Sequence, residues 1–284
     1  MARHVFLPRI GFANAVLAAG MIFLYVPIFS LIAYSFNASR LVTIWGGFSF
    51  RWYGSLFHND IIMSAALRSL EVAIITATAS VILGTMAGYA FARLGRFRGR
   101  MLFSGMMTAP LVMPDVITGI SLLLMFITMG SLIGWPMERG IITISIAHTT
   151  FCMCYVAVII QSRLVAMDVS LEEAAMDLGS RPLGVLIDVT LPIIAPAMLA
   201  GWLLAFTLSL DDLVISSFVA GPGATTLPLL IYSKVKLGVT PDINALATLM
   251  ILTVTLAVTI AGLIMAHRER RRIEDEQLAF GGGG

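Results

Sequence analysis

The sequence predicts an all-α membrane protein, built as one bundle of six transmembrane helices. Of its 284 residues, 58% are hydrophobic and only 12% are charged, whereas soluble domains carry about 25% charged residues. The apolar residues form long runs, which is typical of membrane-spanning helices, because the strands of a membrane barrel would alternate apolar and polar residues. We therefore expect a single transmembrane domain over residues 1–280, and we interpret the glycine tail, residues 281–284, as an added linker.

Six apolar stretches are long enough to cross a bilayer, for which a helix needs about 20 residues. The first contains Pro27, which is expected to kink it. The second contains Gly84 and Gly88, a small-xxx-small spacing that favours close contact between helices. The third is interrupted by Pro110 and Pro114. The expected spans are residues 12–36, 65–92, 101–129, 141–160, 197–220 and 243–266.

The basic residues predict the orientation of these spans. Twelve Arg and Lys residues fall on the side of the two termini and six on the other, and the more basic side of a membrane protein is normally cytoplasmic. We therefore expect both termini, and the connection around Ser170, in the cytoplasm. The long connections 37–64 and 221–242 then lie outside. The first includes Trp45 and Trp52 and forms either an interfacial aromatic belt or a surface for an external partner.

Residues 170–192 form a polar segment in this apolar chain. Ser170 and the glutamate three residues later have the spacing of a capping box, which predicts the start of a short helix. Gly179 favours the end of that helix, because glycine readily adopts the left-handed conformation. Pro182 suits the first turn of a second helix, which Pro192 and the proline four residues after it are expected to limit. The pattern predicts two short helices joined by an elbow.

Each of these two short helices presents an apolar face. The residues that share a face are Ala174, Ala175 and Leu178 in the first helix, and Leu183, Leu186 and Ile187 in the second. Such a surface either docks another protein or rests on the membrane.

The usual signatures of catalysis are missing from the sequence. There is no G-x-x-x-x-G-K-[ST] phosphate loop, and the four histidines lie in separate segments without the spacing of a metal site. No G-x-S-x-G nucleophile motif occurs. The net charge is only +2, so no nucleic-acid partner is indicated. We expect neither an enzyme, nor a metal site, nor a cofactor in this chain.

Three acidic residues lie at membrane depth in the predicted spans: Asp115, Asp211 and Asp212. Each opposes insertion by about 2.5–3.5 kcal/mol at a helix centre, and the segments that hold them contain no Arg or Lys. They either line a pathway for a cationic passenger or cap and anchor helices. His148 is expected to make a hydrogen bond between helices, and Cys152 is expected, like the other cysteine at position 154, to be a packing residue.

The segment 173–192 carries a resemblance to a known family. Glu173, Ala174, Ala175 and Gly179, followed at fixed spacing by a Leu-Pro pair, resemble the coupling loop of binding-protein-dependent ABC importer permeases. Residues 109–119, 201–214 and 221–228 are similar to the putrescine/spermidine permeases of that family, and within it to the second permease subunit of putrescine importers. The ATPase-coupling residues that the resemblance implies are Glu172, Glu173, Ala174, Ala175, Asp177, Gly179, Leu191 and Pro192.

This resemblance implies a type I ABC importer permease fold with a cytoplasmic coupling helix-turn-helix, in the bacterial inner membrane. The implied partners are a second permease subunit, forming a heterodimer, two copies of an ABC ATPase that hold ATP and Mg, and a periplasmic polyamine-binding protein. The implied activity moves a polyamine, putrescine or spermidine, from the periplasm to the cytoplasm, with putrescine as the first candidate because the similarity is to putrescine importers; the sequence does not show which polyamine is preferred. Asp115, Asp211 and Asp212 are the candidate pathway residues, with Trp45 and Trp52 adding cation–π contacts.

Two alternatives stay open from the sequence. One is the same architecture carrying another small substrate, such as a metal ion, another amine or a small organic anion. The other is a stand-alone secondary transporter, against which the absence of an internal inverted repeat and the presence of a large docking loop count.

Overall fold

The computed structural model describes residues 11–41, 44–238, 240–256, 259 and 263. It divides into two compact units, one formed by the chain up to Asn59 and from Lys234 onward, the other by Asp60–Ser233. Each unit is described on its own, and the expectation of a single domain stays a prediction. Five described helices are long and apolar enough to cross a membrane.

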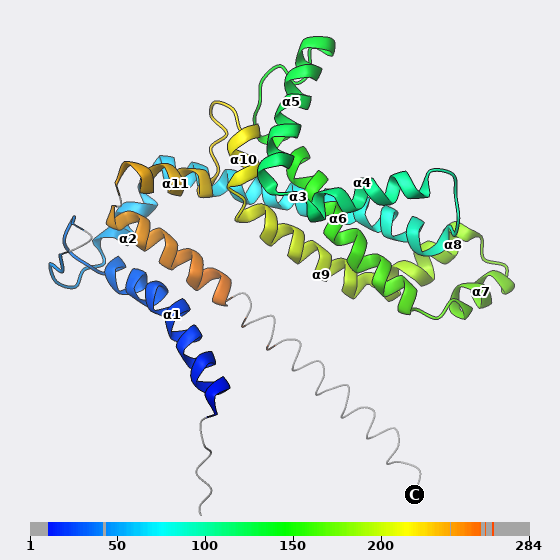
Figure 1. The fold of residues 1–284 in the computed structure, drawn as a ribbon, viewed down its shortest axis with the longest axis horizontal. Coiled ribbons are helices and arrows are strands. Elements are labelled where there is room, and N and C mark those ends of the chain that lie inside the picture. The colour runs from blue at the N-terminus through cyan, green and yellow to red at the C-terminus, as the bar shows by residue number, and fades with distance from the viewer. Residues whose placement is uncertain (1–10, 42–43, 239, 257–258, 260–262, 264–284) are drawn as a thin grey trace, which may run out of the picture. The chain divides into compact units, whose positions relative to one another are not determined.

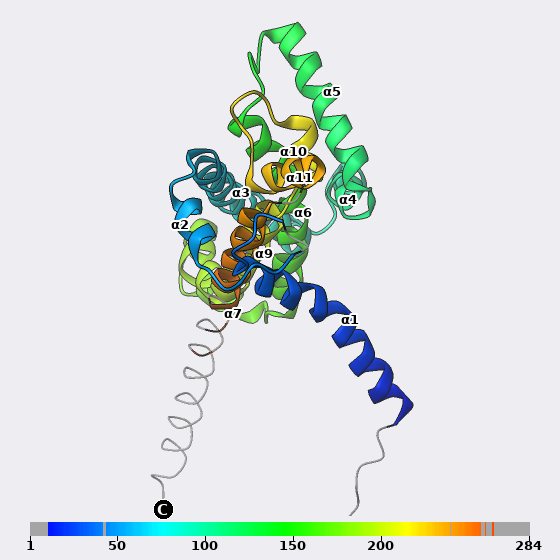
Figure 2. The ribbon, with the colours of Figure 1, turned by 90° about the vertical axis from the view of Figure 1, so that its left-hand side faces the viewer.

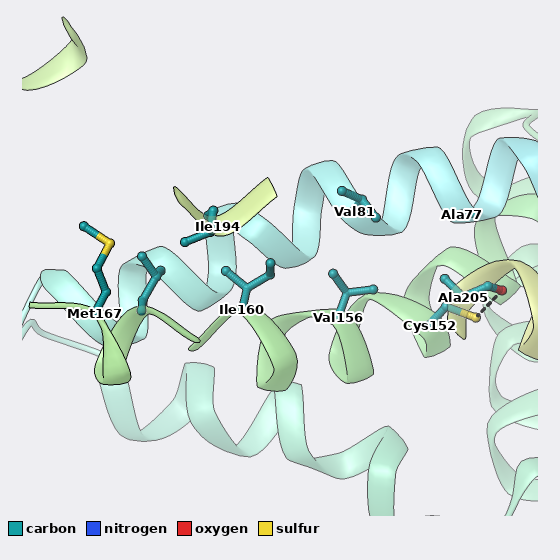
Figure 3. Packing of buried hydrophobic residues seen from close by; sticks show 9 residues of the cluster. Ala77, Val81, Cys152, Val156, Ile160, Met167, Ile194 and Ala205 are labelled. Atoms are coloured by element: carbon teal, nitrogen blue, oxygen red, sulfur yellow. Dashed lines mark hydrogen bonds between the residues drawn. The ribbon is translucent and has the colours of Figure 1, made fainter. Parts of the chain in front are cut away.

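The core of the second unit is a three-helix packing of α3 (Asp60–Arg93), α6 (Ile141–Ala166) and α9 (Leu191–Leu210), which lie side by side in Figure 1. Figure 3 shows the buried side chains between them, with Val156 and Ile160 of α6 among residues from the other two helices. Cys152 lies in the same cluster, and its Sγ is 3.7 Å from the carbonyl oxygen of Ala205. Both cysteines are free and buried, which confirms that they are packing residues.

Two glycines allow α3 and α6 to approach closely. A Cβ at Gly84 would lie 2.7 Å from Val156 Cβ, and one at Gly88 would lie 2.8 Å from the carbonyl oxygen of Ala157. Both distances are too short for real carbon atoms, so only glycine fits at these positions. Gly201 of α9 faces Val156 from the other side, with its hypothetical Cβ 3.2 Å from Val156 Cγ1. The close contact predicted from the small-xxx-small spacing is confirmed.

The third predicted span, residues 101–129, is two helices rather than one. They are α4 (Arg100–Val112) and α5 (Asp115–Ile133), with Met113 in an extended conformation between them. The residue before a proline is pushed out of the helical region, and Pro114 follows Met113, so the break has a local cause. Pro110, in contrast, lies inside α4.

The fifth span also differs from its predicted range of 197–220. Helical backbone runs from Pro182 to Leu210, through α8 (Pro182–Val185), the π-helical turn η1 (Leu186–Thr190) and α9. The expectation that Pro192 and Pro196 limit the second short helix was therefore wrong. The nitrogen of Pro192 has no hydrogen to donate, which disrupts the backbone hydrogen bonds of the helix locally. The π turn just before Pro192 accommodates such a disruption.

After α9 the chain leaves the helical conformation and then forms the short helix α10 (Val214–Val219), so the predicted span is broken within its last third. Figure 2 shows α10 beside α5. Gly119 of α5 leaves room for the ring of Phe218, since a Cβ there would lie 2.6 Å from Phe218 Cδ2.

The first unit contains α1 (Phe12–Ser35), in which Pro27 lies inside the helix, and the short α2 (Arg51–Phe57). A shorter apolar helix covers Pro241–Leu256. The predicted sixth span, 243–266, lies partly outside the described residues, and the glycine tail lies wholly outside them. The helix α11 (Leu227–Leu237) begins in the second unit and ends in the first.

The α3–α6 contact yields a prediction about stability. Gly84→Ala is expected to lower the free energy of unfolding by about 1–3 kcal/mol, because the new methyl group overpacks the contact with Val156. Gly105→Ala in α4, where a Cβ would meet nothing within 4 Å, is the matched control and is expected to stabilise by about 0.5–1 kcal/mol through helix propensity. Thermal unfolding of the purified chain in detergent measures both, and equal melting temperatures would contradict the close approach.

Candidate functional site

The segment 170–192 begins with the helix α7 (Ser170–Asp177), whose N-terminal end is capped differently from the prediction. The residue before the helix is Val169, and the cap comes from Asp168, whose Oδ1 accepts a hydrogen bond of 2.9 Å from Ser170 N–H. This bond holds the pKa of the exposed Asp168 carboxyl below its usual value. The expected capping box of Ser170 and Glu173 was wrong, because Ser170 is already the first helical residue.

The end of α7 is as predicted. Gly179 has a φ of +89°, and its N–H donates to Met176 O while Ser180 N–H donates to Ala175 O. These two bonds form a Schellman motif. The elbow between α7 and α8 is therefore fixed by backbone hydrogen bonds.

Glu172 of α7 is buried and ties this short helix to the ends of two long ones. Its Oε2 lies 2.7 Å from Arg93 Nε in the last turn of α3. Its Oε1 accepts a hydrogen bond of 2.7 Å from Thr190 Oγ1, directly before α9. Only 6% of Glu172 is exposed. One carboxylate thus joins α7 both to the end of α3 and to the start of α9.

Sequence reasoning placed Glu172 among the residues that couple to an ATPase, and the structure turns its side chain inward instead. Arg93 was interpreted only as an orientation charge. The pairing joins residues 79 positions apart, so local sequence patterns carry no signal for it.

The other coupling residues divide into an outward and an inward group. Glu173, Ala174, Asp177, Gly179 and Pro192 are exposed, whereas Ala175 and Leu191 are half-buried. Leu178 and Leu183 are 89% and 72% exposed on the two sides of the elbow. We call the exposed side chains Leu178, Leu183 and Ile187 the elbow face; they form an apolar surface that the chain itself leaves uncovered.

The three acids predicted at membrane depth all lie at helix breaks. Asp115 is the first residue of α5, where it is exposed and makes no side-chain cap. Asp211 is exposed at the C-terminal end of α9, and Asp212 follows it in the break before α10. Of the three, Asp212 contacts α6, through His148.

Asp212 is a helix cap with a buried partner. Its Oδ2 accepts a bond of 2.8 Å from Ser216 N–H, and its Oδ1 accepts one of 3.3 Å from Ile215 N–H. The same Oδ2 lies 3.0 Å from Nε2 of His148. Asp212 therefore has an internal partner, although the absence of Arg and Lys in the sequence suggested that it had none. The predicted bond from His148 to another helix is confirmed, since its Nδ1 lies 2.8 Å from Ser209 Oγ of α9.

The two tryptophans belong to the first unit and are engaged there. Trp52 donates its indole N–H to Asn37 O at 2.7 Å, and the guanidinium carbon of Arg51 lies 4.3 Å from the centre of its ring. One cation therefore already lies over Trp52. Trp45 is exposed and packs edge-on against Tyr34. Their predicted contact with cargo stays a prediction.

Within the described residues, no group of three or more His, Cys, Asp and Glu side chains could hold a metal ion.

Comparison with known proteins identifies the family. Residues 80–274 match the family described as binding-protein-dependent transport system inner membrane component. The chain is 58% identical to the putrescine transport system permease protein PotI of Escherichia coli K12 over 93% of this chain and 94% of that protein. It is 43% identical to the spermidine/putrescine transport system permease protein PotC of the same strain, over 91% of this chain and 94% of that protein.

Solved structures share the fold at low sequence identity. A bacterial ABC transporter involved in the import of the acidic polysaccharide alginate matches with a TM-score of 0.68 and 17% identity, over 94% of this chain and 99% of that one. The MetNI methionine ABC transporter matches with a TM-score of 0.59 and 14% identity, over 74% of this chain and 98% of that one. The predicted type I importer permease fold is confirmed. The chain belongs to the family of inner membrane components of binding-protein-dependent transport systems.

Proposed function

We propose that this chain is the transmembrane permease subunit of an ATP-driven importer that carries polyamines from the periplasm to the cytoplasm. Putrescine is the first candidate for the cargo and spermidine is the second. Its 58% identity to a putrescine permease supports the cargo. The single structural observation that supports a translocation role is the Glu172 anchor, which joins an exposed docking helix to two membrane helices.

The motor is proposed to lie on a partner. The elbow face consists of a few large, exposed apolar side chains on a turn that backbone hydrogen bonds hold in place. In the proposed importer, an ABC ATPase covers this surface. Two ATPase copies hold ATP and Mg and use their closure to push α7. Because Glu172 bonds to both Arg93 and Thr190, that push reaches α3 and α9 together.

The cargo site is proposed to use Asp211 and Asp115. Asp211 has no ion-pair partner among the described residues and lies at the C-terminal end of α9, where the helix dipole is negative and the last carbonyls lack intrahelical donors. A protonated amine is attracted to both features. A polyamine carries more than one ammonium group, so a second acid such as Asp115 can hold the other end.

The remaining partners follow from this assignment. A second permease subunit completes a heterodimer around the pathway, and a periplasmic binding protein delivers the polyamine at the outer loops, 37–64 and 221–242. The termini and the elbow face lie in the cytoplasm. Weak contacts along the pathway suit this role, because cargo must leave as readily as it enters.

Purification of the tagged chain from its native membrane in mild detergent tests the proposal. An ATPase, a second permease and a binding protein are expected to co-purify, and the complex in liposomes is expected to hydrolyse ATP faster when the binding protein carries putrescine. Transport of an organic anion with no response to putrescine or spermidine would overturn the cargo assignment, and proton-driven transport by the chain alone would overturn the dependence on ATP.

The two neighbouring glutamates are expected to differ sharply. Glu172→Ala leaves the Arg93 guanidinium buried without its partner, and we expect a loss of about 3–5 kcal/mol in the free energy of unfolding. Glu173→Ala, at an exposed position, should change stability by less than about 0.5 kcal/mol but reduce the recovery of the ATPase. Melting temperature in detergent and ATPase co-purification measure the two effects. Equal melting temperatures for both variants would exclude the anchor role of Glu172.

Asp211→Asn is expected to reduce putrescine transport about tenfold or more, since it removes a charged acceptor for the cargo ammonium group. ATPase co-purification should be unchanged, because the residue lies at the far end of α9 from Thr190. Glu138→Gln, an exposed acid in the α5–α6 connection, is the matched control and should transport normally. Unchanged transport by the Asp211 variant in reconstituted liposomes would remove this residue from the pathway.

A further inference from the structure

One buried imidazole joins three helices at the break between α9 and α10. His148 projects from α6, and only 2% of it is exposed. Its Nδ1 lies 2.8 Å from Ser209 Oγ in α9, and its Nε2 lies 3.0 Å from Ser216 Oγ in α10 and 3.0 Å from Asp212 Oδ2 in the break itself. The ring therefore contacts the segment before the break, the break and the segment after it.

The partners determine where the ring hydrogen lies. An ionised carboxylate can only accept hydrogen bonds, so Nε2 must carry the hydrogen that is directed at Asp212. The hydroxyl of Ser209 can either donate or accept, and it donates to Nδ1 when the ring is neutral. In the neutral tautomer with its hydrogen on Nε2, both ring nitrogens of His148 therefore have a hydrogen-bond partner.

The carboxylate of Asp212 accepts three hydrogen bonds in this arrangement. Its two oxygens cap the first turn of α10 through Ile215 N–H and Ser216 N–H, and one of them also accepts from His148. Asp212 is therefore unsuited to hold cargo. Its neighbour Asp211 is exposed at the end of α9, and the direction of its side chain depends on how the break is held.

We propose that His148 is a positioning residue for translocation: its Nε2–H bond to Asp212 holds the α9–α10 break in the geometry that presents Asp211 to the cargo. This inference rests on the proposed function, because it takes Asp211 as a cargo-binding residue. The variable that the break controls is the number of polyamine molecules moved for each ATP hydrolysed.

Two substitutions of His148 distinguish the effect of losing the bond to Asp212 from the effect of losing the imidazole ring. Gln places its amide nitrogen near the position of Nε2 and keeps the donor to Asp212, whereas Asn reaches only the position of Nδ1. In the reconstituted complex, His148→Asn is expected to lower putrescine transport per ATP about fivefold or more, the effect of an unsatisfied buried acceptor. His148→Gln is expected to stay within about twofold of the unchanged chain, as a retained hydrogen bond to the carboxylate implies.

Ser209→Ala is the control for the other ring nitrogen. It removes the bond to Nδ1 but leaves the bond to Asp212, so transport per ATP should be close to that of the unchanged chain. Equal coupling ratios for the Asn and Gln variants, or uncoupling by Ser209→Ala as strong as that by His148→Asn, would overturn the proposal. If His148→Asn does not assemble, the Gln variant decides, because its loss of coupling would equally overturn it. Failure of the unchanged complex to move putrescine would instead contradict the proposed function.

Discussion

The close approach of α3, α6 and α9 around Val156 is the constraint on which both candidate sites depend. Gly84 and Gly88 bring α3 against α6, and Gly201 brings α9 against the same valine. Lipid does not drive apolar helices together, so contact of this kind depends on backbones that can pack closely. The consequence is geometric. Arg93 lies at the end of α3, Thr190 and Ser209 lie at the two ends of α9, and His148 lies two turns into α6, so the core sets where those polar groups can meet.

At each end of this core a buried carboxylate joins three segments. Glu172 joins α7 to α3 and to the start of α9, and Asp212 joins the α9–α10 break to α6 and to α10. The 20 residues of α9 connect the two clusters, over about 30 Å for a helix of that length. One continuous helix therefore joins the cluster around Glu172 to the cluster around Asp212.

Features that depend on neighbouring residues could be predicted from the sequence, and those that depend on distant ones could not. The glycine contacts, the left-handed turn at Gly179 and most apolar spans follow from spacing within a few residues. The inward direction of Glu172 is set by its tertiary contact with Arg93. The π turn that carries the helix past Pro192 is a local feature, but the sequence pattern predicted a break there instead. The pairing of His148 with Asp212 joins residues 64 positions apart, and a search for Arg and Lys partners could not reveal a histidine. The resemblance in the coupling segment identified the family correctly but carried no signal that Glu172 is buried while Glu173 is exposed.

The two adjacent aspartates differ in how the free-energy cost of placing a carboxylate in the membrane is offset. Each opposes membrane insertion by about 2.5–3.5 kcal/mol when it lies at a helix centre. For Asp212 that cost is offset within the chain, by two backbone N–H groups of α10 and by the imidazole of His148. Asp211 has no ion pair in the described part of the chain, and it adds its charge to the negative end of α9. Its carboxylate is exposed, so solvent or a bound cation can stabilise it. An acid held in this way attracts an ammonium group and can also release it, because no buried network has to be rebuilt when the cation leaves.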